Sequence, residues 1–308
     1  MNKIIIIGGA TASGKTAFGV ETAKMLDTSV ISCDSMQIYK YMNIGTAKVS
    51  DEETQGVCHY MVDIANPQDE FSVGEYSIQA KKHIDSIIAQ GKIPVIVGGT
   101  GLYIDSILYS FSFGGEKDEK LRRELEDQLE KFGKDYMYDK LKEIDIEDAK
   151  KIHPNNTKRV IRALEIYYST GKNKSQMNNS EKTLLYKPCM VVLNPDREKL
   201  YERINKRVDI MFEKGLEEEV KSLLDMNVGF DKQSMQAIGY KEFKDYFEKK
   251  ISKDELIEKI KQNSRNYAKR QLTWLKKYDF AKWFDPTTQN DECIEYIKDF
   301  CKGANNEI

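Results

Sequence analysis

Residues 4–20 read IIIIGGATASGKTAFGV, which places a glycine-rich turn directly after four isoleucines. The spacing of Gly9, Gly14, Lys15 and Thr16 fits the pattern G-x-x-x-x-G-K-[ST]. In such a loop the backbone N–H groups surround anionic oxygens, the lysine adds a point charge, and the Thr16 hydroxyl can hold Mg²⁺. A flexible surface turn is the alternative. The order of strand-like run, motif and helix-compatible run favours a loop that holds phosphate.

The rest of the chain alternates between short apolar runs and helical patterns. The apolar runs are rich in β-branched residues and predict strands at residues 3–8, 28–34, 92–99 and 189–194. This alternation predicts an α/β fold, in which a P-loop NTPase-like core has a parallel sheet with helices on both faces.

The alternation stops after residue 115. Residues 116–172 are highly charged and helical in period, and the last of these helices is expected to end at Gly171. We therefore expect a P-loop catalytic core formed by residues 1–115 and 173–308, with a helical insertion domain at residues 116–172.

Composition limits the function classes. The net charge of −2 over 308 residues argues against an indiscriminate polyanion binder, although a local basic face remains compatible with it. The five cysteines are scattered without a C-x-x-C pair, so neither a disulfide framework nor a zinc site is expected. The sequence has no run of eighteen apolar residues and no N-terminal signal pattern, so we expect a soluble cytoplasmic protein.

Two polar residues follow predicted strands, where ligands of open α/β sheets bind. Asp34 could orient a hydrated Mg²⁺, act as a general base toward an acceptor, or cap the next helix, and the sequence leaves these roles open. Thr100 lies among glycines that suit either an anion-binding turn or a plain strand-to-helix connection.

Two segments have lysine or arginine residues spaced so that they would share one face of a helix. Arg203 and Arg207 lie one turn apart beside an apolar stripe, where they can either reach a diphosphate or face solvent. A second face, near the C-terminus, combines cations with aromatic rings, which suits RNA with unstacked bases, although basic surface helices are common. Its residues are Lys261, Arg265, Lys269, Lys276, Tyr267 and Trp274.

Six motifs, in order over nearly the full chain, resemble those of the bacterial tRNA dimethylallyltransferases, or tRNA isopentenyltransferases, of the IPP transferase family. They are GGATASGKT, DSMQIYKYMNIGTAK, VGGTGLYI, RVIRALE, QAIGYKEF and YAKRQLTW. The resemblance implies that dimethylallyl diphosphate, not ATP, occupies the loop. It also implies that the dimethylallyl group moves to N6 of adenosine 37, just 3′ of the anticodon, and that diphosphate is released. The implied cofactor is Mg²⁺.

The same resemblance implies residue roles. Asp34 is the base for the N6 proton, Thr100 contacts the reacting region, and Arg207 steadies the diphosphate. The implied diphosphate site is Gly9, Ala10, Thr11, Ala12, Ser13, Gly14, Lys15 and Thr16, with Thr16 also on the metal. The implied tRNA contacts around the adenine are Asp34, Ser35, Met36, Gln37 and Thr100, and Gln37 is the residue that would read the edge of the base. In the insertion the implied contacts are Arg122, Lys158, Arg159, Val160, Ile161 and Arg162. In the core they are Lys269, Arg270 and Trp274.

Two departures from the family pattern are small. Gly9, Ala10 and Thr11 stand where Gly-Pro-Thr is common, which leaves the phosphate contacts intact. Lys158 stands where a glutamine is frequent, which leaves that single RNA contact open.

Three other functions remain compatible with parts of the sequence. A P-loop kinase of nucleosides or metabolites explains the loop, a small-molecule adenylate prenyltransferase shares the chemistry, and a noncatalytic RNA-binding protein switched by nucleotide explains the basic helix. The expected partners are dimethylallyl diphosphate and a tRNA anticodon stem-loop, bound by a monomer that has no membrane contact.

Overall fold

The computed structural model describes residues 1–110, 118–173 and 183–303. The chain forms two compact units, Met1–Leu108 with Leu185–Ile308, called the core unit below, and Tyr109–Leu184, called the insertion unit. The predicted insertion at residues 116–172 lies inside the second unit. Its first boundary, between residues 115 and 116, falls outside the described residues.

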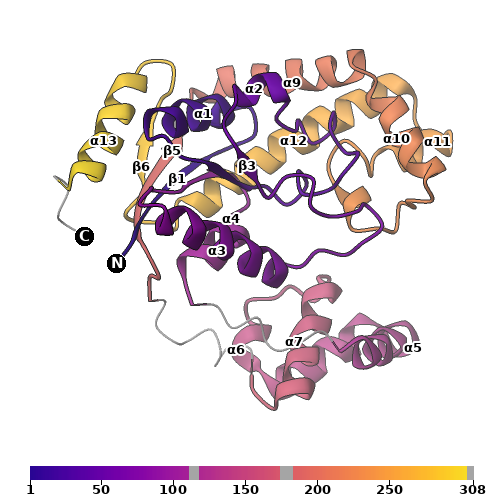
Figure 1. Cartoon of the computed structure of the whole chain (residues 1–308). Helices are drawn as coiled ribbons and strands as arrows, with labels where there is room; N and C mark the ends of the chain where they lie inside the picture. The colour runs from indigo at the N-terminus through magenta and orange to yellow at the C-terminus, as the bar shows by residue number, and fades with distance from the viewer. Residues whose placement is uncertain (111–117, 174–182, 304–308) are drawn as a thin grey trace. The chain divides into compact units, whose positions relative to one another are not determined.

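A six-stranded sheet forms the centre of the core unit (Figure 1). Its strand order is β3-β2-β4-β1-β5-β6, and all neighbouring strands are parallel. The four predicted strands are its four central strands, so the predicted α/β fold class is confirmed. The edge strands β3 and β6 were not predicted, because two and three residues are too few to display a period. The strands are β1 Lys3–Gly9, β2 Val30–Cys33, β3 His59–Tyr60, β4 Val95–Gly98, β5 Lys187–Leu193 and β6 Lys282–Phe284.

Helices cover both faces of this sheet, which explains the unbroken apolar run of β1. On one face, Ile5 and Ile7 pack with Phe18 of α1 and Ile297 of α13. On the other face, Leu275 of α12 lies against Gly8, close to where a Cβ would be. The helices of the core unit are α1 Lys15–Met25, α2 Asp51–Thr54, α3 Val73–Ala89, α4 Gly101–Leu108, α9 Arg197–Glu213, α10 Leu216–Asp225, α11 Phe243–Phe247, α12 Lys253–Leu275 and α13 Asn290–Lys302, with a 3₁₀ turn at Ser234–Gln236.

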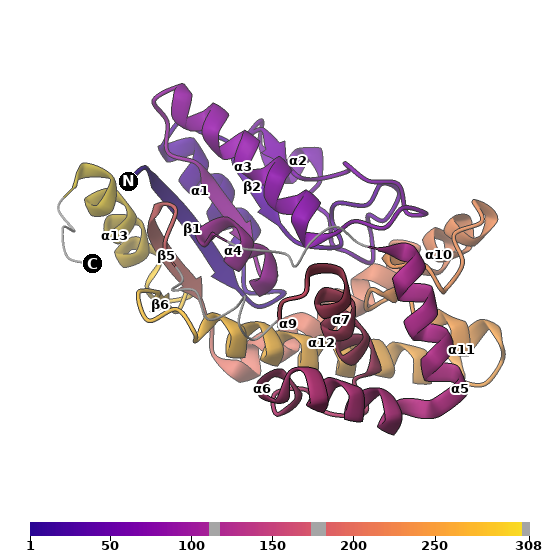
Figure 2. The same cartoon turned by 90° about the horizontal axis from the view of Figure 1, so that it is seen from below.

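Three helices make up the described part of the insertion unit: α5 Glu119–Ile144, α6 Ile146–Ala149 and α7 Thr157–Thr170. α5 and α7 lie side by side (Figure 2) and share a buried apolar cluster that includes Leu125, Leu141 and Leu164. Gly133, with φ of 83°, interrupts α5. α7 ends as predicted at Gly171, whose φ of 67° suits glycine and whose N–H donates to the Tyr167 carbonyl.

Candidate active site

The phosphate loop joins β1 to α1 and has the geometry that its sequence pattern predicts. Gly14 has φ of 95°, a left-handed conformation that favours glycine, and α1 begins at the next residue. A Cβ on Gly9 would lie 2.5 Å from Ser13 Oγ, so the turn also needs glycine there for space. Lys15 Nζ folds back over the loop and donates to the Ala10 carbonyl at 3.2 Å. The loop thus aims its lysine at the position where phosphate binds in such loops.

Asp34 follows β2 and uses one carboxylate oxygen to cap its own turn. Oδ1 accepts from the Met36 N–H at 2.9 Å and from the Gln37 N–H at 3.4 Å. Among the described residues, the second oxygen accepts no hydrogen bond. A capping role and a chemical role are therefore compatible in this one side chain, because each uses a different oxygen.

Thr100 connects two of the loops at the carboxyl edge of the sheet. Its Oγ1 accepts from the Ser35 N–H at 3.2 Å, and its own N–H donates to the Cys33 carbonyl. Tyr267 of α12 lies close by. The pKa of Tyr267 is raised to about 12, first by burial and then by the nearby Asp34 carboxylate, while a hydrogen bond to Thr100 acts in the opposite direction. Tyr267 therefore remains a neutral hydroxyl beside the candidate base.

Arg207 of α9, and not Arg203, is directed to the loop. Its Nη1 donates to Thr11 Oγ1 at 3.1 Å. Arg203 instead lines a separate groove, together with Ser13 and Gly14 of the loop. The two arginines thus line different cavities, and Arg207 faces the one described next.

Two adjoining cavities, of about 250 and 200 Å³, meet at these side chains. Both are lined by Thr11, Lys15, Asp34, Thr46, Ala47 and Arg207. The larger cavity also has an apolar wall, formed by Ile204, Val208, Met211, Ala237, Ile238 and Ile260. The smaller cavity is also lined by the hydroxyl of Thr16 and the carboxylate of Glu53. The site therefore combines an anion-binding end, a carboxylate and an apolar surface.

Burial tunes the charge of Lys15. Its pKa is lowered to about 8, first by desolvation, while Asp34 raises it and the neighbouring Arg207 lowers it further. A bound anion would favour the charged form again, since opposite charge stabilises the ammonium group.

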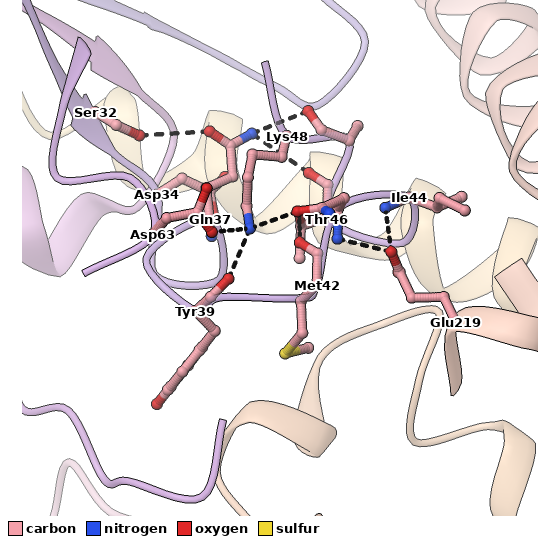
Figure 3. A network of polar contacts seen from close by, with 12 residues as sticks. Ser32, Asp34, Gln37, Tyr39, Met42, Ile44, Thr46, Lys48, Asp63 and Glu219 are labelled. Atoms are coloured by element: carbon pink, nitrogen blue, oxygen red, sulfur yellow. Dashed lines mark hydrogen bonds and ion pairs between the residues drawn. The ribbon is translucent and has the colours of Figure 1, made fainter. Parts of the chain in front are cut away.

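Gln37 lies in the same loop but has its amide group engaged within the protein (Figure 3). Nε2 donates to the Thr46 and Ala47 carbonyls at 3.3 and 3.1 Å, and Oε1 accepts from Ser32 Oγ at 3.4 Å. A hydrogen bond from Gln37 to an adenine would need one of these contacts to open. The neighbouring Ser35 and Met36 line the larger cavity.

Sequence patterns did not identify Gln271, although it holds the phosphate loop. The Thr11 N–H donates to its Oε1 at 2.8 Å, across 260 positions of the chain. The residue is buried on the inner face of α12. Its position within the YAKRQLTW motif was the available signal, but a local pattern cannot reveal so distant a partner.

The predicted basic face of α12 is only partly available for a ligand. Lys261 pairs with Asp209 of α9 at 2.8 Å, and Arg265 donates to Asn205 of α9 at 2.5 Å. These two cations attach α12 to α9. Lys269 and Lys276 line a separate surface groove, whereas Arg270 lines the larger cavity.

Trp274 packs against the start of α4. A Cβ on Gly101 would lie 2.0 Å from Trp274 Cδ1, so the indole needs this glycine. Lys277 Nζ lies 3.7 Å from the centre of the indole ring. Trp274 thus helps to hold the helix that follows Thr100.

The predicted RNA-contacting residues of the insertion unit fall into three groups. Lys158 and Arg159 are exposed. Arg122 and Arg162 flank the buried Glu165, at 3.8 and 3.0 Å. The side chains of Val160 and Ile161 are buried in the helical core of the unit, so an RNA contact from them would have to involve the backbone or act through their neighbours.

Two features are absent from the part of the chain that the structure describes. Within residues 1–110, 118–173 and 183–303, no helix is long and apolar enough to cross a membrane. The same residues hold no group of three or more His, Cys, Asp or Glu side chains placed to bind a metal ion.

Comparison with known proteins identifies the family. A family model described as IPP transferase matches residues 37–278. A tRNA dimethylallyltransferase of Bacillus cereus (strain AH187) is 49% identical, over 96% of this chain and 94% of that protein. One of Thermoanaerobacter sp. (strain X514) is 50% identical, over 92% of this chain and 91% of that protein.

Solved structures agree with the sequence comparison. The full-length tRNA isopentenylpyrophosphate transferase of Bacillus halodurans is 43% identical, with a TM-score of 0.73 over 98% of this chain and 96% of that one. A eukaryotic dimethylallyltransferase described as acting on tRNA is 31% identical, with a TM-score of 0.87 over 98% of this chain and 80% of that one. The relatives cover nearly the whole chain, including its phosphate loop and its cavity-facing carboxylate. The chain belongs to the IPP transferase family.

Proposed function

We propose that this protein transfers the dimethylallyl group of dimethylallyl diphosphate to N6 of adenosine 37 in tRNA and releases diphosphate. The observation that carries the proposal is the convergence of Lys15, Arg207 and Asp34 on the same pair of cavities. The names of the relatives support this class of reaction. None of the relatives described above is a kinase, so the kinase alternative gains no support from them.

The anion-binding end suits a diphosphate that departs. As the bond between C1 of the allylic group and its oxygen breaks, negative charge grows on the diphosphate oxygens. Lys15, Arg207 and the backbone N–H groups of residues 9–16 are placed to stabilise that charge, which is the largest contribution in many active sites. The Thr11 N–H already donates a hydrogen bond to Gln271, so it can stabilise the diphosphate only if it leaves that acceptor.

Mg²⁺ fits the donors at this end. The Thr16 hydroxyl and the Glu53 carboxylate line the smaller cavity, and magnesium prefers oxygen ligands. When bound there, Mg²⁺ would neutralise charge on the diphosphate. Thr16 is the residue that we assign to it first, by the role of this position in phosphate loops.

The acceptor end requires a base. The adenine N6 forms a bond to C1 of the dimethylallyl group and must lose one proton. Asp34 Oδ2 is the acceptor for that proton, because Oδ1 is held by the turn. Thr100 and Ser35 keep this turn in place, and the neutral Tyr267 hydroxyl lies beside it. A base positioned in this way contributes ~100- to 10,000-fold in rate.

The tRNA contacts are assigned to both units. Ser35, Met36 and Gln37 would surround the adenine, which must leave its stack to reach the cavity. Lys158 and Arg159 would contact phosphates of the stem-loop, assisted by Arg122 and Arg162. Lys269, Arg270 and Trp274 would contact it from the core unit. The protein is proposed to act as a cytoplasmic monomer.

A set of parallel incubations distinguishes this function from its alternatives. The protein is mixed with radiolabelled dimethylallyl diphosphate and either an anticodon stem-loop or free AMP, and a parallel series uses labelled ATP. Label from dimethylallyl diphosphate in the stem-loop alone supports the proposal. Label in AMP indicates an adenylate prenyltransferase, and label transferred from ATP to a small molecule indicates a kinase.

A further inference from the structure

The loop of residues 34–48 forms one wall of the candidate site without helix or strand of its own. Asp34, Ser35 and Met36 at its start line the larger cavity, and Gly45, Thr46 and Ala47 near its end line it as well. Backbone hydrogen bonds join its middle to residues 63–65, such as those from the Ile64 and Ala65 N–H groups to the Ile38 carbonyl. The N–H groups of residues 43–45, near its end, need side-chain acceptors instead.

Glu219 of α10 supplies such contacts at the end of the loop (Figure 3). Its Oε2 accepts from the N–H groups of Asn43 and Ile44, both at 2.8 Å. Its Oε1 accepts from the Gly45 N–H at 3.1 Å and from the Tyr240 hydroxyl at 2.6 Å. One carboxylate thus binds three successive backbone amides and a tyrosine. Hydrogen bonds to a charged acceptor are about twice as strong as neutral ones.

The packing around this carboxylate leaves little freedom. Tyr240 is fully buried, and a Cβ on Gly45 would lie 2.4 Å from Tyr240 Cε2. Residues 236–239, which precede Tyr240, line the larger cavity as well. Glu219 therefore fastens one wall of the cavity to the segment that forms another.

Lys48 holds the loop from a different side. Its Nζ donates to the Tyr39 carbonyl at 2.7 Å and to Asn43 Oδ1 at 2.8 Å, and it pairs with Asp63 (Figure 3). The lysine side chain is only 5% exposed. Lys48 and Glu219 thus meet at Asn43, one through its side chain and the other through its backbone.

Hydrogen bonds continue from this fastened segment to the candidate base. Thr46 and Ala47 follow the three bound amides, and their carbonyls accept the Gln37 amide. The Gln37 N–H in turn donates to Asp34 Oδ1. A shift at residues 43–45 can therefore reach the carboxylate that accepts the proton.

From this geometry we propose that Glu219 is a positioning residue, which acts through residues 43–47 and Gln37 to hold the acceptor side of the cavity, including Asp34, in its reactive arrangement before RNA binds. Lys48 supports the same loop. The inference rests on the proposed function and deepens it, because it assigns a role in acceptor positioning to a side chain outside the phosphate loop.

The test compares Glu219→Gln with Glu218→Gln in the full chain. Glutamine keeps the size of the side chain but turns an NH₂ group toward backbone N–H groups, so at least one oxygen's contacts are lost. Glu218 is the adjacent, exposed residue of α10, so its variant makes the same charge change without touching the loop. Tyr240→Phe removes one of the four contacts, and Lys48→Met probes the second support if Glu219→Gln fails to fold.

Four quantities are measured for each variant: steady-state kinetics with an anticodon stem-loop, affinity for inorganic diphosphate, hydrogen exchange of the amides of residues 43–45, and thermal stability. For Glu219→Gln we expect kcat/KM for the stem-loop to fall by ~10- to 100-fold, the range for a misplaced reacting group. Amide exchange should become faster, and diphosphate affinity should stay within about twofold because the phosphate loop is untouched. Tyr240→Phe should show a smaller change in the same direction.

Two results would overturn the inference. Kinetics and exchange equal to those of Glu218→Gln would show that the contacts do not position the acceptor side. A parallel loss of diphosphate affinity and thermal stability would show a general structural role. Absence of transfer to RNA by the unaltered protein would instead reject the proposed function, and the inference with it.

Discussion

At the scale of single residues, Asp34 shows how one carboxylate can serve structure and chemistry together. Oδ1 caps the turn of residues 34–37, while Oδ2 accepts no hydrogen bond within the described part of the chain. A substitution that removes the whole group would therefore mix two effects. Asparagine separates them, because its side-chain oxygen can still accept from the same backbone amides.

We expect Asp34→Asn and Asp34→Ala both to lower kcat by at least ~100-fold, since neither retains a base. Affinity for the stem-loop should change little in the asparagine variant and more in the alanine variant, which also loses the cap. Single-turnover kinetics and RNA titration measure these quantities. Near-normal turnover in Asp34→Asn would show that the carboxylate acts only as a cap.

The lowered pKa of Lys15 predicts a pH dependence. With a pKa of about 8, the free enzyme carries the ammonium charge below that pH and loses it as pH rises through about 8. The value of kcat/KM for dimethylallyl diphosphate should therefore fall above pH ~8, because kcat/KM reports groups of the free enzyme. In Lys15→Arg, whose guanidinium stays charged, this fall should be absent. An unchanged alkaline limb in that variant would assign the ionisation to another group.

Sequence patterns predicted the residues whose function is local in the chain. The phosphate loop was recognisable because its glycines, Lys15 and Thr16 act within eight positions. Gln271 and Glu219 were not recognised, since their partners lie 260 and about 175 positions away. Buried contacts of this kind depend on packing that no local spacing records.

At the scale of elements, α12 acts as a support as well as a surface. Gln271 holds the phosphate loop, Tyr267 lies beside Asp34, and Lys261 joins the helix to α9. A helical face read from sequence showed only that cations and aromatic rings alternate. It could not show which cations are paired with α9, because the partners belong to another helix.

In the insertion unit, Arg122 and Arg162 have a structural task besides any RNA contact. Glu165 is 1% exposed, and its pairing with these arginines offsets the free energy of burying its charge. Replacing both arginines with glutamine should lower the free energy of unfolding by about 3 kcal/mol or more. Denaturant unfolding measures this change. Adding Glu165→Gln should restore most of the free energy of unfolding. If it restores none, the unpaired buried charge of Glu165 is not the cause of the destabilisation.

The exposed pair Lys158 and Arg159 gives a cleaner test of RNA binding. If they contact phosphates, changing both to glutamine should flatten the slope of log affinity against log salt by up to ~0.7 to 0.9 per contact. Turnover at saturating RNA should be nearly unchanged, because such contacts position the substrate. Lys150→Gln, in the same unit and 64% exposed, is the control. An unchanged slope in the double variant would reject the predicted contacts.

At the scale of the whole molecule, the parallel sheet explains why segments distant in sequence share one site. The carboxyl ends of β1, β2 and β4 carry the phosphate loop, Asp34 and Thr100, and α9 after β5 carries Arg207. The order of apolar runs was sufficient to predict this edge. The supports of the loop of residues 34–48 came from α10 and Tyr240, which the strand order does not specify.

Locating the dimethylallyl group in the product tests the proposed reaction directly. The protein is incubated with dimethylallyl diphosphate, Mg²⁺ and an anticodon stem-loop, and the digested RNA is analysed by mass spectrometry, with a stem-loop lacking adenosine 37 as control. We predict a single dimethylallyl group on N6 of adenosine 37, formed with one equivalent of diphosphate, and none in the control. Transfer to another nucleotide, or no transfer to the stem-loop, would contradict the proposed function.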